Sequence, residues 1–236
     1  MSDATINVEH ISDPTVIVGH RDFIETIGKS IIGGRMHHAW LLVGPRGIGK
    51  ASVARLMAAW LLSEEFSDIE LFNGKVTRLS VLRDDPGSKL VFNGAHPDYL
   101  SIVPIADDNK SGQIKIDQIR SMLAFLAHKP ARNGFRVVVI DSMDEVSSNG
   151  SNAMLKLLEE PPANAIIFLI SSRPGQLPLT IRSRCRIARL RALDTLSCRN
   201  VLAKVWPDAH TDHVEFLSKL SDGAPGRAIS LAKSGA

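Results

Sequence analysis

Three short runs of mainly apolar residues stand out along the chain, at positions 39–43, 136–141 and 166–170. Strands that are buried on both faces of a parallel sheet have this continuous apolar pattern. Between the runs, apolar residues recur at helical spacing or strong helix formers dominate. These segments predict helices at about 23–32, 51–62, 116–128 and 148–160. Strands that alternate with helices indicate an α/β protein with a parallel sheet.

The rest of the chain is less regular, and it changes character near residue 190. A further strand is predicted at 99–103 and a polar loop at 107–112, whereas residues 63–98 show no clear period and are interpreted as a surface insertion. Ser147 or Ser148 can cap the helix that follows, and Pro161 ends it. After residue 191 only helices are predicted, at about 195–206, at 212–220 and from Pro225 onward. We therefore expect an α/β domain at residues 1–190 and a small all-α domain at 191–236.

Composition and charge exclude several classes of protein. A chain of 236 residues with 44% hydrophobic and 22% charged residues can bury a real core, which argues against intrinsic disorder. No apolar run approaches the ~20 residues of a membrane span, residues 1–14 do not resemble a signal peptide, and two cysteines are too few for a disulfide framework. These features predict a cytoplasmic protein without membrane partners. The net charge of +3 is too small to indicate nucleic-acid binding by bulk charge.

A glycine-rich loop carries the clearest chemical signal. Gly44, Gly47, Gly49 and Lys50 have the GxxxxGK spacing of a phosphate loop, directly after a predicted strand and before a predicted helix. In such a loop, backbone N–H groups surround an anion and the lysine reaches its terminal phosphates. The Ser or Thr that would ligate Mg²⁺ is absent, because Ala51 follows the lysine and Ser52 comes one place late, about 100° around the helix. We therefore expect this site to bind a Mg²⁺–nucleotide complex weakly.

The second half of a nucleotide site is also incomplete. Asp141 ends an apolar strand and is the candidate Mg²⁺ ligand, but Ser142 follows it where hydrolysing ATPases usually have a Glu that polarises water. Asp144 and Glu145 lie two and three residues farther on, and we interpret them as a solvated pair of loop carboxylates, since a base must be within hydrogen-bond reach of its water. Two requirements for hydrolysis are therefore missing.

Five arginines occur within ten residues at the end of the α/β domain: Arg182, Arg184, Arg186, Arg189 and Arg191. Such a cluster is more often a solvated surface than a site. Its position after a strand and at the edge of a domain also suits a guanidinium that meets the nucleotide of a neighbouring subunit.

Several motifs together resemble a known family. Residues 36–50, the His-Pro-Asp segment at 96–98, the Asn-Ala-Met-Leu-Lys-Leu-Leu-Glu-Glu-Pro-Pro segment at 152–162 and residues 181–185 are similar to the clamp-loader subunits of bacterial DNA polymerase III, of the AAA+ class. The similarity is greatest to the delta-prime type and extends from about Val16 to the end. It implies a RecA-like P-loop domain followed by a helical lid, in a five-subunit ring that opens the sliding clamp and places it on primed DNA. The implied partners are the ATPase subunits, the delta subunit, the clamp and primer–template DNA.

The resemblance also implies roles for individual residues. Lys50 would be the phosphate-loop lysine, Asp141 the strand-end acid, and Ser171 or Ser172 the sensor after the next strand. Arg184 would be the arginine finger that acts in trans on the ATP of an adjacent subunit, and Arg227 the sensor arginine of the lid.

Departures from the ATPase subunits favour a subunit that does not hydrolyse ATP, requires no cofactor and binds ATP or ADP weakly. Zinc is not expected, since residues 66–95 lack the cysteines of the family's zinc module, and the family's third, collar domain is expected to be absent. The alternative is an active AAA+ ATPase in which Ser52 and Asp144 or Glu145 replace the missing groups. A P-loop kinase or GTPase would leave the lid and residues 183–185 unexplained.

Five further side chains are expected to be structural. His37 and His38 have no metal-ligand partners at a suitable spacing, and no basic residues alternate with the aromatic ones. Trp40, Trp60 and Trp206 are therefore predicted in the core.

Overall fold

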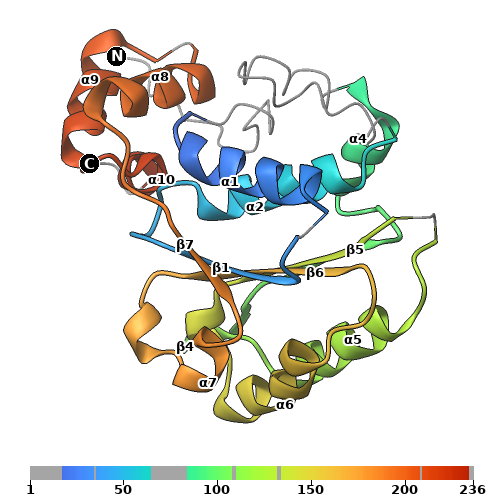
Figure 1. Ribbon diagram of the computed structural model, residues 1–236. Helices are drawn as coiled ribbons and strands as arrows, with labels where there is room; N and C mark the ends of the chain where they lie inside the picture. Colours follow the sequence, from blue (N-terminus) through green and yellow to red (C-terminus); the bar gives the residue numbers. More distant parts are fainter. Residues whose placement is uncertain are drawn as a thin grey trace.

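Five parallel strands form the central sheet, in the order β2–β5–β6–β1–β7 (Figure 1). The computed structural model describes residues 18–34, 36–64, 84–107, 110–131, 134–207 and 209–233. The strands are β1 (Ala39–Val43), β2 (Tyr99–Ile102), β5 (Arg136–Asp141), β6 (Ala165–Ser171) and β7 (Arg186–Arg189). The four strands predicted from the sequence are confirmed.

The fifth strand, β7, was not predicted. It lies at the edge of the sheet beside β1, and three of its four residues are exposed. A strand in this position needs no continuous apolar run, because only its Ala188 is buried.

Helices cover both faces of the sheet (Figure 1). One face carries α1 (Arg21–Ile32), α2 (Lys50–Leu61) and α4 (Pro86–Phe92), and the other carries α5 (Ile116–Ala127), α6 (Ser148–Glu159) and α7 (Leu179–Arg182). Side chains alternate along each strand, so Trp40 and Leu42 pack with the first set of helices and Leu41 and Val43 with the second. The result is a layered α/β domain with a core on each side.

Local sequence signals account for the start of α6. The Ser147 Oγ accepts a hydrogen bond from the Gly150 N–H at 3.1 Å, which satisfies one of the free donors of the first turn. The chain leaves the helix at Glu160, directly before Pro161, as predicted.

The prediction of a polar loop at 107–112 was wrong, and the insertion at 63–98, to which no element was assigned, contains a helix. The segment 107–112 lies largely in a two-stranded antiparallel hairpin of β3 (Ile105–Asp107) and β4 (Lys110–Gln113). Helix α4 lies within the predicted insertion at 63–98, where the Asp85 carboxylate accepts from the Ser88 N–H at 2.6 Å and Pro86 occupies the first turn. Residues 65–83 of that insertion lie outside the described residues. Both missed elements are too short to show a clear period.

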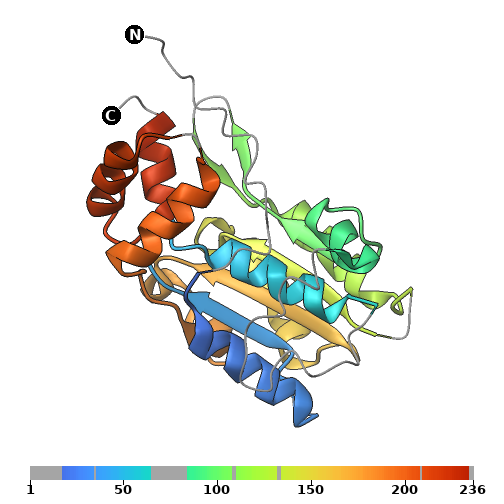
Figure 2. The ribbon, with the colours of Figure 1, turned by 90° about the horizontal axis from the view of Figure 1, so that it is seen from above.

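Three helices form the lid: α8 (Thr195–Val205), α9 (Thr211–Leu220) and α10 (Pro225–Lys233). They have a core of their own that includes Leu202, Trp206 and Leu217. The last strand of the sheet ends at Arg189, so the expected boundary at residue 190 falls where strands give way to helices. Figure 2 shows the lid beside the end of the sheet at which β1 leads into α2.

The three tryptophans have relative exposures of 1%, 1% and 6% and lie in the core, as predicted. The described residues also include two short 3₁₀ helices, η3 (Met143–Glu145) and η4 (Pro174–Gln176). Among the described residues, no helix combines the length and the apolar character that crossing a bilayer requires.

Candidate functional site

A cavity of about 610 Å³ lies between the glycine loop, the carboxyl ends of the central strands and the lid. Five of the eight residues proposed from the sequence as a catalytic or nucleotide site line it, namely Gly47, Gly49, Lys50, Ser52 and Asp141, and so do Ala51, Ser142, Glu145 and Ser172. Gly44, Arg184 and Arg227 do not line it. Ligands of open α/β sheets commonly bind at this edge, and the volume lies within the range of small-molecule sites.

The glycine loop has a backbone that requires glycine at two positions. Gly47 and Gly49 have φ angles of +80° and +94°, which side chains with a Cβ rarely adopt. Helix α2 begins at Lys50, directly after this turn, so the free N–H groups of its first turn lie at the cavity. The loop thus has the backbone of a phosphate-binding turn.

The ammonium group of Lys50 is held inside the loop. Its Nζ donates hydrogen bonds to the carbonyl oxygens of Gly44 at 2.8 Å and Pro45 at 2.6 Å, and to the Ser172 Oγ at 3.0 Å. Burial lowers the pKa of Lys50, and the nearby carboxylates of Asp141 and Asp144 oppose that shift. Lys50 therefore connects the loop to the end of β6.

Asp141 lies at the end of β5, as predicted, and its carboxylate borders the cavity. The Ser142 hydroxyl donates a hydrogen bond to the Asp141 Oδ1 at 3.2 Å. At position 142, where a water-polarising acid would be needed, the side chain is thus a neutral donor bound to its neighbour.

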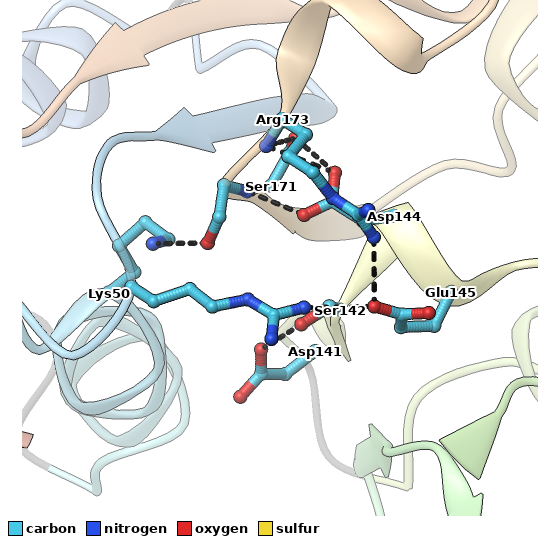
Figure 3. Close-up of polar contacts among 9 residues, drawn as sticks. Lys50, Asp141, Ser142, Asp144, Glu145, Ser171 and Arg173 are labelled. Atoms are coloured by element: carbon cyan, nitrogen blue, oxygen red, sulfur yellow. Dashed lines mark hydrogen bonds and ion pairs between the residues drawn. The ribbon is translucent and has the colours of Figure 1, made fainter. Parts of the chain in front are cut away.

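Asp144 is not a solvated loop carboxylate, and that interpretation was wrong. Its Oδ1 accepts from the Ser171 Oγ at 2.5 Å and its Oδ2 from the Ser172 N–H at 2.6 Å (Figure 3). The Arg173 N–H adds a longer hydrogen bond to Oδ1 at 3.3 Å. Asp144 therefore fixes the end of β6, including the serine that binds Lys50.

Glu145 is also engaged. Its Oε1 accepts from the Arg46 guanidinium at 2.9 Å and from the Arg173 guanidinium at 3.0 Å, and its side chain is only 22% exposed. The pair of arginines comes from the glycine loop and from the residue after Ser172. The two ion pairs of Glu145 thus connect the glycine loop to the segment that follows β6.

Arg184 lies away from the cavity, after α7. Its guanidinium forms an ion pair with Glu159 of α6 and donates to the Thr180 carbonyl at 2.8 Å, and its side chain is 32% exposed. Arg186, in β7, lies over the Trp40 ring at 4.9 Å from the centroid. The arginine cluster therefore has several distinct environments rather than one shared site.

The lid contacts the glycine loop directly. The Gly226 N–H donates to the Gly47 carbonyl at 2.8 Å, and a Cβ on Gly226 would stand 2.9 Å from the Gly47 Cα. The following residue, Arg227, forms an ion pair with Asp222 at 2.8 Å within the lid. This close approach places the start of α10 at the cavity.

Comparison with known protein families agrees with these features. The model described as "DNA polymerase III, delta subunit" matches residues 19–194. The chain belongs to this family. The delta' subunit of Pseudomonas aeruginosa is 32% identical over 204 residues, which cover 86% of this chain and 58% of the relative. The tau subunit of Salmonella typhimurium is 32% identical over 219 residues, which cover 91% of this chain and 32% of the relative. The resemblance to clamp-loader subunits of the AAA+ class is confirmed, although the chain spans only part of each relative.

Solved structures confirm the fold alone. The RuvB Holliday junction branch migration motor of Thermotoga maritima matches with a TM-score of 0.54 and 16% identity, over 92% of this chain and 61% of that one. A DNA polymerase III gamma subunit-related protein of the same organism matches with a TM-score of 0.51 and 19% identity, over 90% and 61% of the two chains. The domain is therefore RecA-like.

The residues at the cavity fit a nucleotide better than they fit its metal ion. The glycine loop offers backbone N–H groups and Lys50 for phosphates, and Leu193, Val201 and Ile229 of the lid region offer apolar contacts for a base. Ala51, which follows Lys50 in the first turn of α2, has no side-chain oxygen to ligate Mg²⁺. When bound, a nucleotide would supply the phosphates that these groups recognise.

The two histidines beside β1 have structural roles. The rings of His37 and His38 stack at 4.5 Å, with Nδ1 of His37 against the Ala39 carbonyl at 2.9 Å and Nε2 of His38 against the Leu158 carbonyl at 3.0 Å. Within the described residues, no group of three or more His, Cys, Asp or Glu could hold a metal ion.

Sequence reasoning missed several residues of the cavity. His20 precedes α1, and its Nε2 lies 2.8 Å from the Ile48 carbonyl, a contact across 28 residues that no local pattern reveals. Arg46 lies within the glycine motif and could have been considered from its position. Lys204, in α8, also lines the cavity, and only the docking of the lid shows this.

Proposed function

We propose that this chain is a delta-prime-type subunit of the DNA polymerase III clamp loader, which does not itself hydrolyse ATP and supplies Arg184 to a neighbouring ATPase site. Its partners are then the ATPase subunits, the delta subunit, the sliding clamp and, through the complex, primer–template DNA. We place the complex in the cytoplasm. The proposal is supported by family membership and by a relative named delta'.

The engagement of Asp144 is the observation that favours a subunit without hydrolysis. An active site would need a carboxylate free to polarise water, because Ser142 cannot act as a base. Asp144 accepts hydrogen bonds from Ser171, Ser172 and Arg173, and Glu145 forms ion pairs with two arginines. Freeing either acid would break several contacts that hold the end of β6.

The position of Arg184 supports action in trans. It lies outside the cavity of its own chain, and its only ion-pair partner in the described part of the chain is Glu159, which is 48% exposed. A half-exposed ion pair contributes little to stability, so a phosphate of the ATP bound to an adjacent subunit could displace the Glu159 carboxylate from Arg184. A planar guanidinium would then stabilise the charge that develops on that phosphate.

The cavity itself would hold nucleotide weakly and without a catalytic purpose. Gly47, Gly49 and Lys50 would face phosphates, with Asp141 nearby, whereas Gly44 would act behind them by accepting a hydrogen bond from Lys50, and no cofactor would be required. Ser52 lines the cavity and is exposed, which leaves the alternative of an active ATPase open to a direct test.

That test is steady-state ATP turnover by the purified chain, alone and with ATPase subunits. We expect turnover at background alone, because a metal ligand and a water-polarising acid are both missing. Turnover by the isolated chain at the rate of a motor subunit, abolished by Lys50→Ala, would establish the active ATPase instead.

The trans role is tested by Arg184→Ala in a reconstituted loader. Trans-acting arginine fingers contribute roughly 10³–10⁵-fold in rate at their own site, so clamp- and DNA-stimulated ATPase should fall, in part because other sites remain active. Arg189→Ala and Arg191→Ala are matched controls, since both are exposed outside the motif. Equal activity of Arg184→Ala and wild type, with assembly confirmed, would remove the finger role.

A further inference from the structure

The lid presents one face of α8 to the cavity. Val201, Lys204 and Val205 all line it, and their spacing of three and four residues places them on the same side of the helix. The lid thus contributes two apolar side chains and one cation to the wall opposite the glycine loop.

The other lining cations are already bound to protein. Lys50 donates to three oxygens, and Arg46 forms an ion pair with Glu145. Lys204 has no hydrogen-bond or ion-pair partner in the part of the chain that the structure describes. Among the described residues that line the cavity, Lys204 is therefore the lysine or arginine that a bound anion can engage without breaking a hydrogen bond or ion pair within the protein.

Arg227 is the lid cation that the sequence motif suggests, but its surroundings differ. It does not line the cavity, and its guanidinium is paired with Asp222 at 2.8 Å. A rotation toward the cavity would have to break that ion pair. Lys204 needs no such rearrangement.

We infer that Lys204 is the residue of the lid that recognises the phosphates of a nucleoside diphosphate or triphosphate in this cavity, ahead of Arg227. The inference rests on the weak nucleotide binding proposed above. The base packs against the apolar wall that includes Val201, Val205 and Ile229, while the ammonium of Lys204 adds positive charge beside the polyphosphate. Nucleotide occupancy is thereby coupled to the position of α8.

The experiment is equilibrium binding of a fluorescent methylanthraniloyl-ADP to the full 236-residue chain at low salt. Lys204→Ala should weaken binding by about three- to tenfold, the scale expected for one charge near a polyphosphate in a hydrated cavity. Lys204→Arg should restore affinity to within about twofold, and the loss in Lys204→Ala should shrink at high ionic strength. Arg227→Ala should weaken binding less than Lys204→Ala does.

Lys219→Ala is the matched control. Lys219 is also an exposed lysine of the lid, but it forms an ion pair with Glu215 in α9 and does not line the cavity. The affinity of Lys219→Ala for the fluorescent ADP should equal that of wild type. Lys50→Ala reports whether the probe binds at the glycine loop at all.

Three results would overturn the inference: equal affinity of Lys204→Ala and wild type, a larger loss for Arg227→Ala, or no binding of the probe by the wild-type chain at millimolar concentration. None of these results would bear on the proposed trans role of Arg184, because that role is tested by the ATPase activity of the reconstituted loader. Conversely, loss of the Arg184 effect would leave the binding result standing.

Discussion

Asp98, in the His-Pro-Asp segment, anchors the loop that leads into β5. Its side chain is 2% exposed and forms an ion pair with Arg136 at 3.3 Å. The Ala131 N–H donates to both of its carboxylate oxygens, at 2.9 and 3.0 Å. The segment therefore has a structural role: Asp98 holds Arg136, the first residue of β5, the strand that ends at Asp141.

The cost of removing this carboxylate can be worked from these contacts. Asp98→Ala leaves the Arg136 guanidinium, itself only 13% exposed, without its counter-ion. Breaking a buried ion pair costs about 3–5 kcal/mol. Arg136 keeps hydrogen bonds to the carbonyls of Phe125 at 2.5 Å and Lys129 at 3.2 Å, so we expect the lower end, about 3 kcal/mol. For a chain of this size, that corresponds to a fall in Tm of roughly 6–12 °C.

The assay is thermal and urea unfolding followed by circular dichroism. The matched control is Asp117→Ala, which removes an ion pair with Arg120 at 2.9 Å whose carboxylate is 81% exposed. That change should cost about 0.5 kcal/mol or less. A loss below about 1 kcal/mol for Asp98→Ala, or equal losses for the two variants, would refute the reasoning about the buried pair.

Three other predictions concern pH, thiol chemistry and metal. Burial lowers the pKa of His20 and His38 below the ordinary 6.5, so their contribution to stability is complete above about pH 6.5 and is lost as the pH falls through the folded-state values. His20→Gln and His38→Gln should flatten the fall in unfolding free energy between about pH 7.5 and 5.5, and an unchanged slope would contradict this. Burial raises the pKa of Cys185 to about 12, so iodoacetamide should alkylate it at least about tenfold more slowly at pH 8 in the folded than in the urea-unfolded chain, and equal rates would exclude this assignment. Freshly purified protein should contain well below one zinc ion per chain, and a stoichiometric zinc that survives dialysis would show otherwise.

Much of the fold was predictable because its signals are local. The strands β1, β5 and β6 are continuously apolar in their central residues, since both faces of a central parallel strand are buried. The glycine loop was recognisable because positive φ angles and close backbone approach restrict the residue type. The lid helices followed from periodicity and from Pro225 at the start of the last one.

The missed elements lack such signals. Strand β7 reads Arg-Ile-Ala-Arg and is held in place by pairing with β1, because an edge strand needs to bury only one residue here. The β3–β4 hairpin and α4 are short, since β3 has three residues and α4 has seven, and the start of α4 is marked by the single Asp85 cap.

Some residues of the candidate site could likewise be predicted from the sequence, and others could not. Sequence alone predicted a phosphate loop, the presence of Ala51 and Ser142 where hydrolysing ATPases are expected to have a metal ligand and an acid, and Asp141 at the end of a neighbouring strand, since each follows from residue type and spacing. Only the tertiary structure decided that Asp144 binds the end of β6, because its partners lie 27 or more residues away. It likewise decided that Lys204 faces the cavity. That placement depends on how the three helices of the lid, which have a core of their own, pack onto the glycine loop through a close backbone contact.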